Sequence, residues 1–523
     1  MKRIYITLVF LLVGMVGMAY LYFSNLHTET SANDSSLNAV ASSSALVFSF
    51  DNEKSFYDIL SGQEIFADIL GEEKSKQLKA LNSLVNDANV NNAFSGQKVY
   101  IGFLPGEKNT IDFIITSQLK SAVDVNQVIN GLKRKLKVDK ANDLYQLTFA
   151  DSATCFLSIQ KSLVVLGSTA DAINQTLKNN SENITPFTNY VKNNSRYNKN
   201  TLASLFVNFN LLPQVLKNIL TTNLTGELSV LDKQDAFATF TYSFSKDKLL
   251  FSGTTEINAQ NSYHKLFVDE AEQKLTIQNI LPEKTANFTA YGIADYKRWK
   301  NNLNILFTST KEFSKIEENI KRIDQKHRLD LNQIFSTYFK NQLLTFELAS
   351  GEKFGAIALS NGEKVSQSFL DVSEEYDLDI RIFREDGIPY SFFGQPFKKF
   401  EKPYFIIIDN YLIMANNASN LQVFLNSYRN NKLLSQDENF ISFNDQISSS
   451  STILFYINRK NSNDIFGRNL KAPYFKQYQS SKGFKDYNAF SYQLAADNGK
   501  FLTNLLLFKK EEKILVPDTL KTN

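Results

Sequence analysis

Apolar and polar positions follow the same plan in two stretches of the chain. Residues 155–177 read CFLSIQKSLVVLGSTADAINQTL, and residues 404–426 read YFIIIDNYLIMANNASNLQVFLN, 249 positions later. Each stretch begins with two short apolar segments separated by polar residues, which predicts a β-hairpin with turns at Gln160–Lys161 and Asp409–Asn410. Apolar positions three and four apart follow a polar capping residue, which predicts a helix after each hairpin.

Further stretches match in the same order at nearly the same spacing. In one of them Leu205 is expected opposite Leu454, and Phe206 opposite Phe455. Spacings that drift slowly without a change of order are what an internal duplication with small insertions leaves. The matching stretches are 45–60 with 288–303 at a spacing of 243, 203–210 with 452–459 at 249, and 237–257 with 489–508 at 252.

These patterns predict an α+β protein built from two similar lobes, at residues 45–280 and 281–510. The strands are short and joined by turns, so the sheets are expected to be mainly antiparallel, with packed helices. The alternative is two unrelated α+β domains with similar patterning. Residues 511–523 are expected to form a C-terminal tail.

The N-terminal residues 1–23 predict a transmembrane anchor. Lys2 and Arg3 precede residues 4–23, which carry no charge. Twenty helical residues span about 30 Å, the thickness of the hydrocarbon core of a bilayer. The flanking positive charges place the N-terminus in the cytoplasm and the body outside. A cleaved signal peptide with a site near Gly17–Ala19 is the alternative.

Residues 24–44 are rich in Ser, Asn and Thr and show no hydrophobic period, which predicts a flexible stalk. The chain has 523 residues and one Cys. A long exported chain with one Cys is more typical of a bacterial envelope than of a eukaryotic secretory route, where disulfides are common. We therefore expect a single-pass protein of the bacterial cytoplasmic membrane with its body in the periplasm.

Composition narrows the classes of function. A net charge of +3 gives no field suited to nucleic acid. One Cys and three His that lie far apart in the sequence give no multi-Cys zinc site and no His pair at ligand spacing. The sequence therefore predicts no cofactor and no metal.

Motifs for catalysis are also absent from the sequence. It contains no phosphate-binding glycine loop, no H-E-x-x-H and no G-x-S-x-G. Asp377 and Asp379 lie in the alternating stretch 375–382, which predicts a half-buried strand with a solvated acidic face rather than a cation site. We expect a protein that is not an enzyme.

Residues 387–405, GIPYSFFGQPFKKFEKPYF, combine three Pro with several aromatic residues. The first half has a much shorter segment at the corresponding place, so this is an elaboration of one copy. An exposed aromatic lip for a ligand or a partner is one interpretation, and a loop whose rings cap the second core is the other. The candidate lip residues are Tyr390, Phe392, Phe393, Phe397, Phe400 and Tyr404.

Residues 312–335 predict one long amphipathic helix with an apolar stripe that includes Ile316 and Ile320. Nearer the middle of the chain, residues 279–292 read NILPEKTANFTAYG. With the N-terminal segment and the repeated strand–helix units, this stretch resembles a loose group of uncharacterised exported bacterial proteins. The resemblance implies a topology and no activity.

We therefore expect a membrane-anchored, non-catalytic envelope protein that acts as an extracytoplasmic binding or assembly module with an envelope protein as its partner. A carrier or sensor for an apolar ligand such as lipid is the first alternative. An envelope hydrolase without a recognisable motif is the second.

Overall fold

Strands dominate the computed structural model of the chain. The predicted anchor at 1–23 and the predicted tail at 511–523 lie outside the residues that the structure describes. No helix among the described residues is both long enough and apolar enough to span a bilayer. The described residues are 35–51, 76–77, 92–94, 97–120, 123–150, 152–180, 184–195, 204–222, 235–245, 247–480 and 484–509.

Ten strands of the first half pair edge to edge in the order β4-β5-β6-β7-β3-β2-β1-β8-β9-β10. Every pairing is antiparallel, as the short connections predict. The strands are β1 (Leu46–Asp51), β2 (Lys98–Pro105), β3 (Ile111–Gln118), β4 (Lys137–Ala141), β5 (Leu144–Thr148), β6 (Thr154–Gln160), β7 (Leu163–Gly167), β8 (Ser204–Asn208), β9 (Ala236–Phe244) and β10 (Lys248–Ile257).

Ten strands of the second half pair in the order β15-β16-β17-β18-β14-β13-β12-β20-β21-β22. Each of the nine pairings has a counterpart in the first half, so the two halves share one strand order. The strands are β12 (Thr285–Gly292), β13 (Phe339–Leu348), β14 (Lys353–Leu359), β15 (Ser373–Asp377), β16 (Ile380–Phe383), β17 (Tyr404–Ile408), β18 (Tyr411–Ala415), β20 (Ile453–Asn458), β21 (Tyr487–Asp497) and β22 (Lys500–Lys509).

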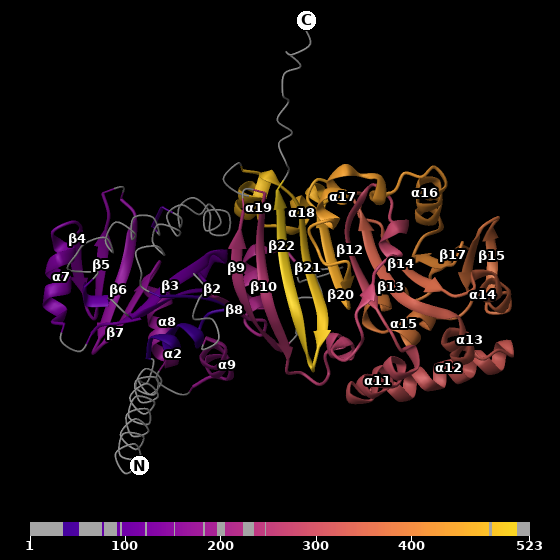
Figure 1. Cartoon of the computed structure of the whole chain (residues 1–523), viewed down its shortest axis with the longest axis horizontal. Helices are drawn as coiled ribbons and strands as arrows, with labels where there is room; N and C mark the ends of the chain where they lie inside the picture. Colours follow the sequence, from indigo (N-terminus) through magenta and orange to yellow (C-terminus); the bar gives the residue numbers. More distant parts are fainter. Residues whose placement is uncertain are drawn as a thin grey trace, which may run out of the picture.

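The halves join through their last strands, because β10 pairs antiparallel with β22. Both strands lie side by side in the middle of the body in Figure 1, with β4 near one end and β15 near the other. Ser252 lies opposite Asn504, and these residues are equivalent at the spacing of 252 found in the sequence. A pseudo-two-fold axis therefore passes through this residue pair.

A second contact follows the same axis. Leu220 and Leu470 form an isolated antiparallel bridge. The amide of Thr221 donates to the carbonyl of Asn469 at 2.8 Å, and the amide of Lys471 donates to the carbonyl of Ile219 at 2.9 Å. These two bonds exchange under the pseudo-two-fold axis, so the junction resembles the isologous interface of a dimer.

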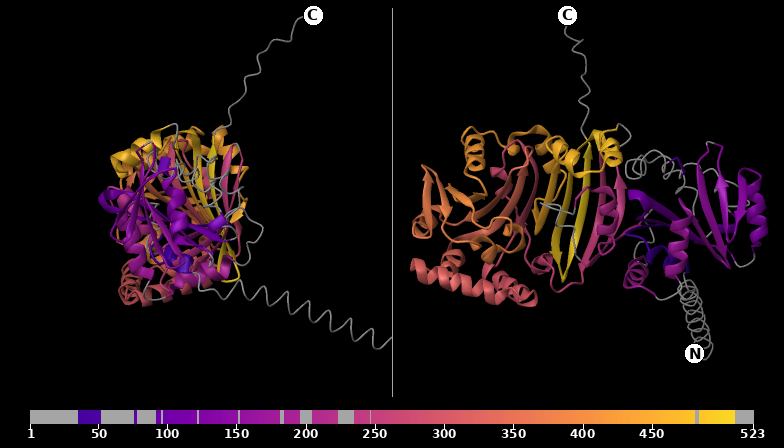
Figure 2. Two further views of the ribbon diagram at one scale, coloured as in Figure 1. Left: turned by 90° about the vertical axis from the view of Figure 1, so that its left-hand side faces the viewer. Right: turned by 180° about the vertical axis from the view of Figure 1, so that it is seen from behind.

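Seen from behind in Figure 2, the strands in the middle of the body are open to view, and most helices of the second half lie along its upper and lower sides. The first half carries α2 (Ser35–Ala41), α7 (Val125–Lys133), α8 (Ala170–Asn180), α9 (Pro186–Ser195) and α10 (Leu212–Ile219). The second half carries α11 (Tyr296–Ser309), α12 (Phe313–His327), α13 (Leu331–Tyr338), α14 (Gly362–Ser368), α15 (Ile388–Phe393), α16 (Ala418–Arg429), α17 (Glu438–Asn444), α18 (Asn463–Asn469) and α19 (Ala472–Gln479).

Short elements connect these parts. A two-stranded ribbon is formed by β11 (Gln273–Lys274) and β19 (Ser450–Ser451). The single 3-10 turns are η1 (Glu107–Asn109), η3 (Tyr263–Phe267), η4 (Ile277–Ile280), η5 (Gln395–Phe397), η6 (Leu434–Gln436) and η7 (Phe484–Asp486).

The two halves share a core rather than enclosing separate ones. One cluster of buried side chains runs from Phe48 in β1 to Leu507 in β22 and includes residues of both halves. A second cluster covers the other face of the second half, around Phe346 and Phe424. The predicted pair of lobes is therefore one continuous sheet, because pairing of β10 with β22 covers the edges at which two lobes would separate.

The structure corrects the sequence alignment of the repeats by two residues at 45–60, because Phe48 pairs with Leu205 and Thr289 with Phe455, and by one residue at 203–210. Leu205 pairs with Phe240, and Phe455 pairs with Tyr492, so Leu205 corresponds to Phe455 and not to Leu454. Leu205 and Phe455 lie in the shared core, whereas Leu454 faces the opposite side of the sheet. A shift of one residue moves a side chain to the other face, which hydropathy does not detect when both faces are buried.

The repeated hairpins form as predicted, but the first turn is also shifted by one residue. Gln160 pairs with Leu163, so the turn is Lys161–Ser162 rather than Gln160–Lys161. The second turn is Asp409–Asn410, as predicted. Lys161 and Asp409 have positive φ values of 56° and 49°, the conformation that a two-residue hairpin turn requires.

The predicted flexible stalk is wrong over its last residues, because α2 lies within it. Leu37 and Val40 of this helix are buried against the sheet. Gly102 in β2 lacks the Cβ that would collide with Val40 and Ser44. The missing side chain of Gly102 therefore allows the helix to approach the strands closely. The rest of the predicted stalk, residues 24–34, lies outside the described residues.

Two predicted elements of the second half are broken in the structure. The expected helix over 312–335 ends at Arg328, which has φ 51° and ψ 46°, and α13 begins after it. The expected strand over 375–382 is the hairpin of β15 and β16. Leu378 lies at its turn and is 92% exposed, so the alternating pattern did not mark a buried face.

Candidate functional site

The predicted aromatic lip is part of the core. Phe392, Phe393, Phe397 and Phe400 are each at most 1% exposed. A lip needs accessible rings, so this prediction is corrected: the four rings cap the second half from inside. A Cβ atom on Gly355 of β14 would lie only 2.7 Å from the ring of Phe397, so the ring packs directly on the backbone of this strand.

The two tyrosines of the predicted lip are half-buried and lie apart from each other. Tyr390 in α15 donates from its hydroxyl to Glu312 at 3.0 Å. Tyr404 in β17 packs edge-on against Tyr376, with 5.0 Å between the ring centroids. The segment therefore brings no common binding surface together.

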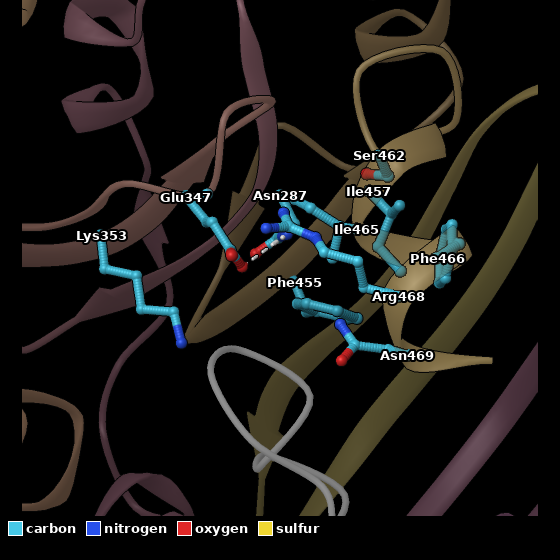
Figure 3. A pocket seen from close by; sticks show the side chains of 11 residues that line it. Asn287, Glu347, Lys353, Phe455, Ile457, Ser462, Ile465, Phe466, Arg468 and Asn469 are labelled. Carbon is cyan, nitrogen blue, oxygen red and sulfur yellow. Dashed lines mark hydrogen bonds between the residues drawn. The ribbon is translucent and has the colours of Figure 1, made fainter. Parts of the chain in front are cut away.

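A pocket of about 290 Å³ lies elsewhere in the second half, between the sheet and α18. Strands β12, β13, β14 and β20 provide one wall and α18 provides the other. Figure 3 shows its lining side chains. They are Asn287, Glu347, Lys353, Phe455, Ile457, Ser462, Ile465, Phe466, Arg468 and Asn469, with Gly351 at the turn between β13 and β14.

Hydrogen bonds at the start of α18 fix the helix to the sheet. Ser462 Oγ donates to the carbonyl of Ala286 at 2.9 Å. Asn461 Nδ2 donates to the carbonyls of Glu283 and Thr285 at 2.8 and 2.9 Å. These bonds reach the first residues of β12 and Glu283 just before it, so they fix α18 against the strand wall of the pocket.

The strand wall is polar at its centre. Asn287 is 8% exposed and lies on β12 beside an irregularity in the pairing with β13. Its Nδ2 donates to Glu347 Oε2 at 3.4 Å. Its Oδ1 is buried and has no hydrogen-bond partner. A buried acceptor without a partner costs about 1–3 kcal/mol, so this atom needs an explanation.

Two cationic side chains line the pocket. Arg468 extends from α18 toward Asn287 and Glu347 in Figure 3, and Lys353 projects from β14. The turn before β14 can come close to the guanidinium because Gly351 has φ 98° and no side chain; a Cβ there would lie 3.1 Å from Arg468 Nη2. Together with Glu347, the three ionisable groups give a formal charge of +1.

The described residues of the first half have a different side chain at the position equivalent to Arg468. The residue that corresponds to Arg468 is Asn218, at the spacing of 250 that relates Leu220 to Leu470. Asn218 Nδ2 donates to the carbonyls of Gly106 and Thr110, at 2.8 and 2.9 Å, and so closes the turn between β2 and β3. One copy therefore uses this position to brace a turn, and the other presents a cation to a pocket.

Only a weak signal for this site is present in the sequence. Asn287 stands within TANFTAYG, where an amide interrupts a strand that is buried along its whole length. Arg468 and Lys353 are ordinary surface residues in the sequence. Their convergence depends on the pairing of β12 with both β13 and β20.

The most perturbed carboxyl group lies in a different cluster. Glu385 accepts from Arg322 Nη1 at 2.8 Å, Lys326 Nζ at 2.6 Å and His327 Nε2 at 2.9 Å. Burial raises its pKa, but the hydrogen bonds and charges of these three residues outweigh that effect and lower the pKa to about 2. Glu385 is 5% exposed, and the cluster fastens α12 to the loop before α15.

Nothing in the described part of the chain gathers three or more His, Cys, Asp or Glu side chains in a metal-binding arrangement. Asp377 and Asp379, the acids considered from the sequence, bind neighbours on α16. Asp377 Oδ2 accepts from Gln422 at 3.2 Å, and Asp379 Oδ2 from Arg429 at 2.8 Å. These acids act as surface contacts between the hairpin and the helix.

Comparison with known proteins does not extend this description. No family model, no curated protein and no solved structure matches the chain. The resemblance to exported bacterial proteins therefore stays an expectation about topology, and the site has to be interpreted from its own geometry.

Proposed function

We propose that the chain is a non-catalytic binding or assembly module of the bacterial cell envelope, with a second envelope protein as its partner. Residues 4–23 anchor it in the cytoplasmic membrane, and the body faces the periplasm. The observation that carries the proposal is the pocket under α18. It combines a rigid wall, an unpartnered acceptor at Asn287 and a cation at Arg468.

Internal duplication accounts for the difference between equivalent positions in the described residues of the two halves. Nine equivalent strand pairings and a junction on a pseudo-two-fold axis support descent of both halves from one ancestral unit. After duplication, one copy is sufficient to brace the fold. The other copy is then free to change residues around a pocket, as the pair Asn218 and Arg468 illustrates.

Crosslinking in intact cells tests this function. The full-length protein is crosslinked, purified, and analysed by mass spectrometry for proteins and for lipids. A specific envelope protein at near-stoichiometric yield is the expected result. A bound lipid without a protein would favour the apolar-ligand carrier instead, and recovery of neither would refute both interpretations.

The location is tested by replacing residues 4–23 with a cleavable signal peptide. The body is then expected in the soluble periplasmic fraction, whereas the unmodified chain is expected in the membrane fraction. A replaced chain that still sediments with membranes would show that another part of the body attaches it.

A further inference from the structure

A ligand in the pocket can donate a hydrogen bond to Asn287 Oδ1, the acceptor at its centre. Asn287 Oδ1 is buried and without a partner, and the residue lines the pocket beside Glu347. An N–H or O–H group would satisfy this atom. Asn287 is paired with Glu347 on one side and Ile457 on the other, so its side chain stays on the pocket face of the sheet as long as this register holds.

The positive charges of Arg468 and Lys353 favour a ligand with an anionic group. In the part of the chain that the structure describes, Arg468 donates from Nε to the carbonyl of Asp464 at 3.3 Å, which leaves both terminal nitrogens for another acceptor. Such a planar group matches a carboxylate with two parallel hydrogen bonds. Lys353 adds a second positive charge. The formal charge of +1, with Glu347 included, favours a monoanion over a dianion such as phosphate.

The rest of the pocket lining includes apolar side chains, and the pocket is small. Phe455 and Ile457 of β20 face Ile465 and Phe466 of α18 across the pocket. Its volume of about 290 Å³ lies at the lower end of the range for ligand pockets, so it accommodates a group of about one or two residues. A ligand therefore needs an apolar part beside its charged and donating parts.

We propose that this pocket binds an amphipathic monocarboxylate that carries an N–H donor, which is the chemistry of the carboxyl-terminal residue of a peptide. The carboxylate pairs with Arg468 and Lys353, the N–H donates to Asn287 Oδ1, and the apolar side chain packs on Phe455 and Ile465. The inference rests on the proposed function as a binding module and names the chemistry that the module recognises.

Isothermal titration of the full-length protein in detergent micelles tests the inference with three probes. N-acetyl-leucine has all three features, N-acetyl-leucinamide lacks the carboxylate, and inorganic phosphate lacks the N–H and the apolar part. The acid is expected to bind, and the amide is expected to bind roughly tenfold more weakly or worse, because the charge-assisted pair is lost. Equal binding of acid and amide, tighter binding of phosphate, or no binding of the acid at millimolar concentration would overturn the proposal.

Variants locate the binding event. Arg468→Gln is expected to weaken binding of N-acetyl-leucine roughly ten- to hundredfold. Arg429→Gln is the matched control, since Arg429 is an exposed arginine that pairs with Asp379 on another surface, and it is expected to leave binding unchanged. If both variants bind like the unmodified protein, the pocket is not the site.

Asn287→Leu separates ligand binding from a structural role. Leucine has a similar size and removes the unsatisfied acceptor, so the variant is expected to unfold at the same or higher denaturant concentration while binding the acid more weakly. A variant that loses stability and binding together would point to a structural role for Asn287.

The titrations and the crosslinking experiment together distinguish a wrong ligand assignment from a wrong assembly role. If cells expressing Arg468→Gln yield the same crosslinked partner as unmodified cells, the module binds its partner through another surface. If the titrations succeed but crosslinking recovers no protein, the pocket serves a small ligand and the assembly role is wrong.

Discussion

Replacing Glu385 with Gln removes a negative charge that three side chains of α12 share. The carboxylate is 5% exposed, and it accepts from Arg322, Lys326 and His327 at 2.6 to 2.9 Å. Glutamine keeps the size of the side chain but leaves the cations without a counter-charge. The expected effect is therefore electrostatic, with little change in packing.

The magnitude follows from the pKa. Three neighbouring donors lower the pKa of Glu385 from 4.5 to about 2, although burial acts in the opposite direction. Each pKa unit corresponds to 1.36 kcal/mol, so the upper bound at pH 7 is about 3 kcal/mol. Arg322 and Lys326 are more than half exposed and can return to water, which reduces the expected loss to about 2 kcal/mol.

The sign of the pH dependence is fixed by the lowered pKa. The stabilisation from Glu385 is complete above the unfolded pKa of 4.5 and is lost as the pH falls toward the folded pKa of about 2. The difference between the unmodified protein and Glu385→Gln is thus expected to be constant from pH 7 to pH 5. By pH 3 it is expected to shrink to about half.

Trp299 offers a direct assay. It is the single Trp of the chain and is fully buried on α11, in the core that α12 also joins. Its fluorescence during urea unfolding gives the stability difference at each pH. Glu317→Gln is the control, because Glu317 forms an exposed pair with Lys321 on the same helix and should cost less than about 0.5 kcal/mol. Equal losses in both variants, or a Glu385→Gln loss that does not change with pH, would refute the reasoning.

Three further predictions concern the packing of the second half and use the same assay. Burial lowers the pKa of Lys300 from 10.5 to about 8, so the charged lysine destabilises the folded protein below pH 8. Lys300→Met is therefore expected to stabilise the protein by about 1–3 kcal/mol below pH 8, and this gain should vanish as the pH rises toward 10.5. A loss of stability at pH 7 would contradict this reasoning. Gly355→Ala is expected to destabilise by about 1–3 kcal/mol because its Cβ would lie 2.7 Å from the ring of Phe397, and combining it with Phe397→Leu should recover part of that loss. Ser462→Ala removes the bond to the carbonyl of Ala286 and is expected to cost about 1 kcal/mol; a neutral result would mean that α18 is held by other contacts.

Local patterns in the sequence predicted several elements well. The hairpins at 155–167 and 404–415 and the helices that follow them form as the pattern predicts, with the first turn shifted by one residue. The cap of α8 is a case in point: Thr169 Oγ1 accepts from the amide of Ala172 at 3.2 Å. Turn residues, caps and apolar spacing act over a few residues, so their effect is visible in the sequence.

Predictions that depend on which side chains are buried by other elements were less accurate. The rings at 387–405 were compatible with both an exposed lip and an internal cap, and only packing against elements such as α13 and β13 distinguishes the two. The Ser-rich segment before β1 was expected to be a stalk, yet part of it is the buried helix α2. Composition describes what a segment contains and not which surface covers it.

The sequence by itself determined that this is an α+β chain with mainly antiparallel strands and two matching series of elements, because hydrophobic period and turn chemistry are local properties. Only the tertiary structure decided that the two series form one sheet about a pseudo-two-fold axis at Ser252 and Asn504. It alone also brought Asn287, Lys353 and Arg468 to one pocket, since their common place depends on the pairing of strands that are distant in sequence.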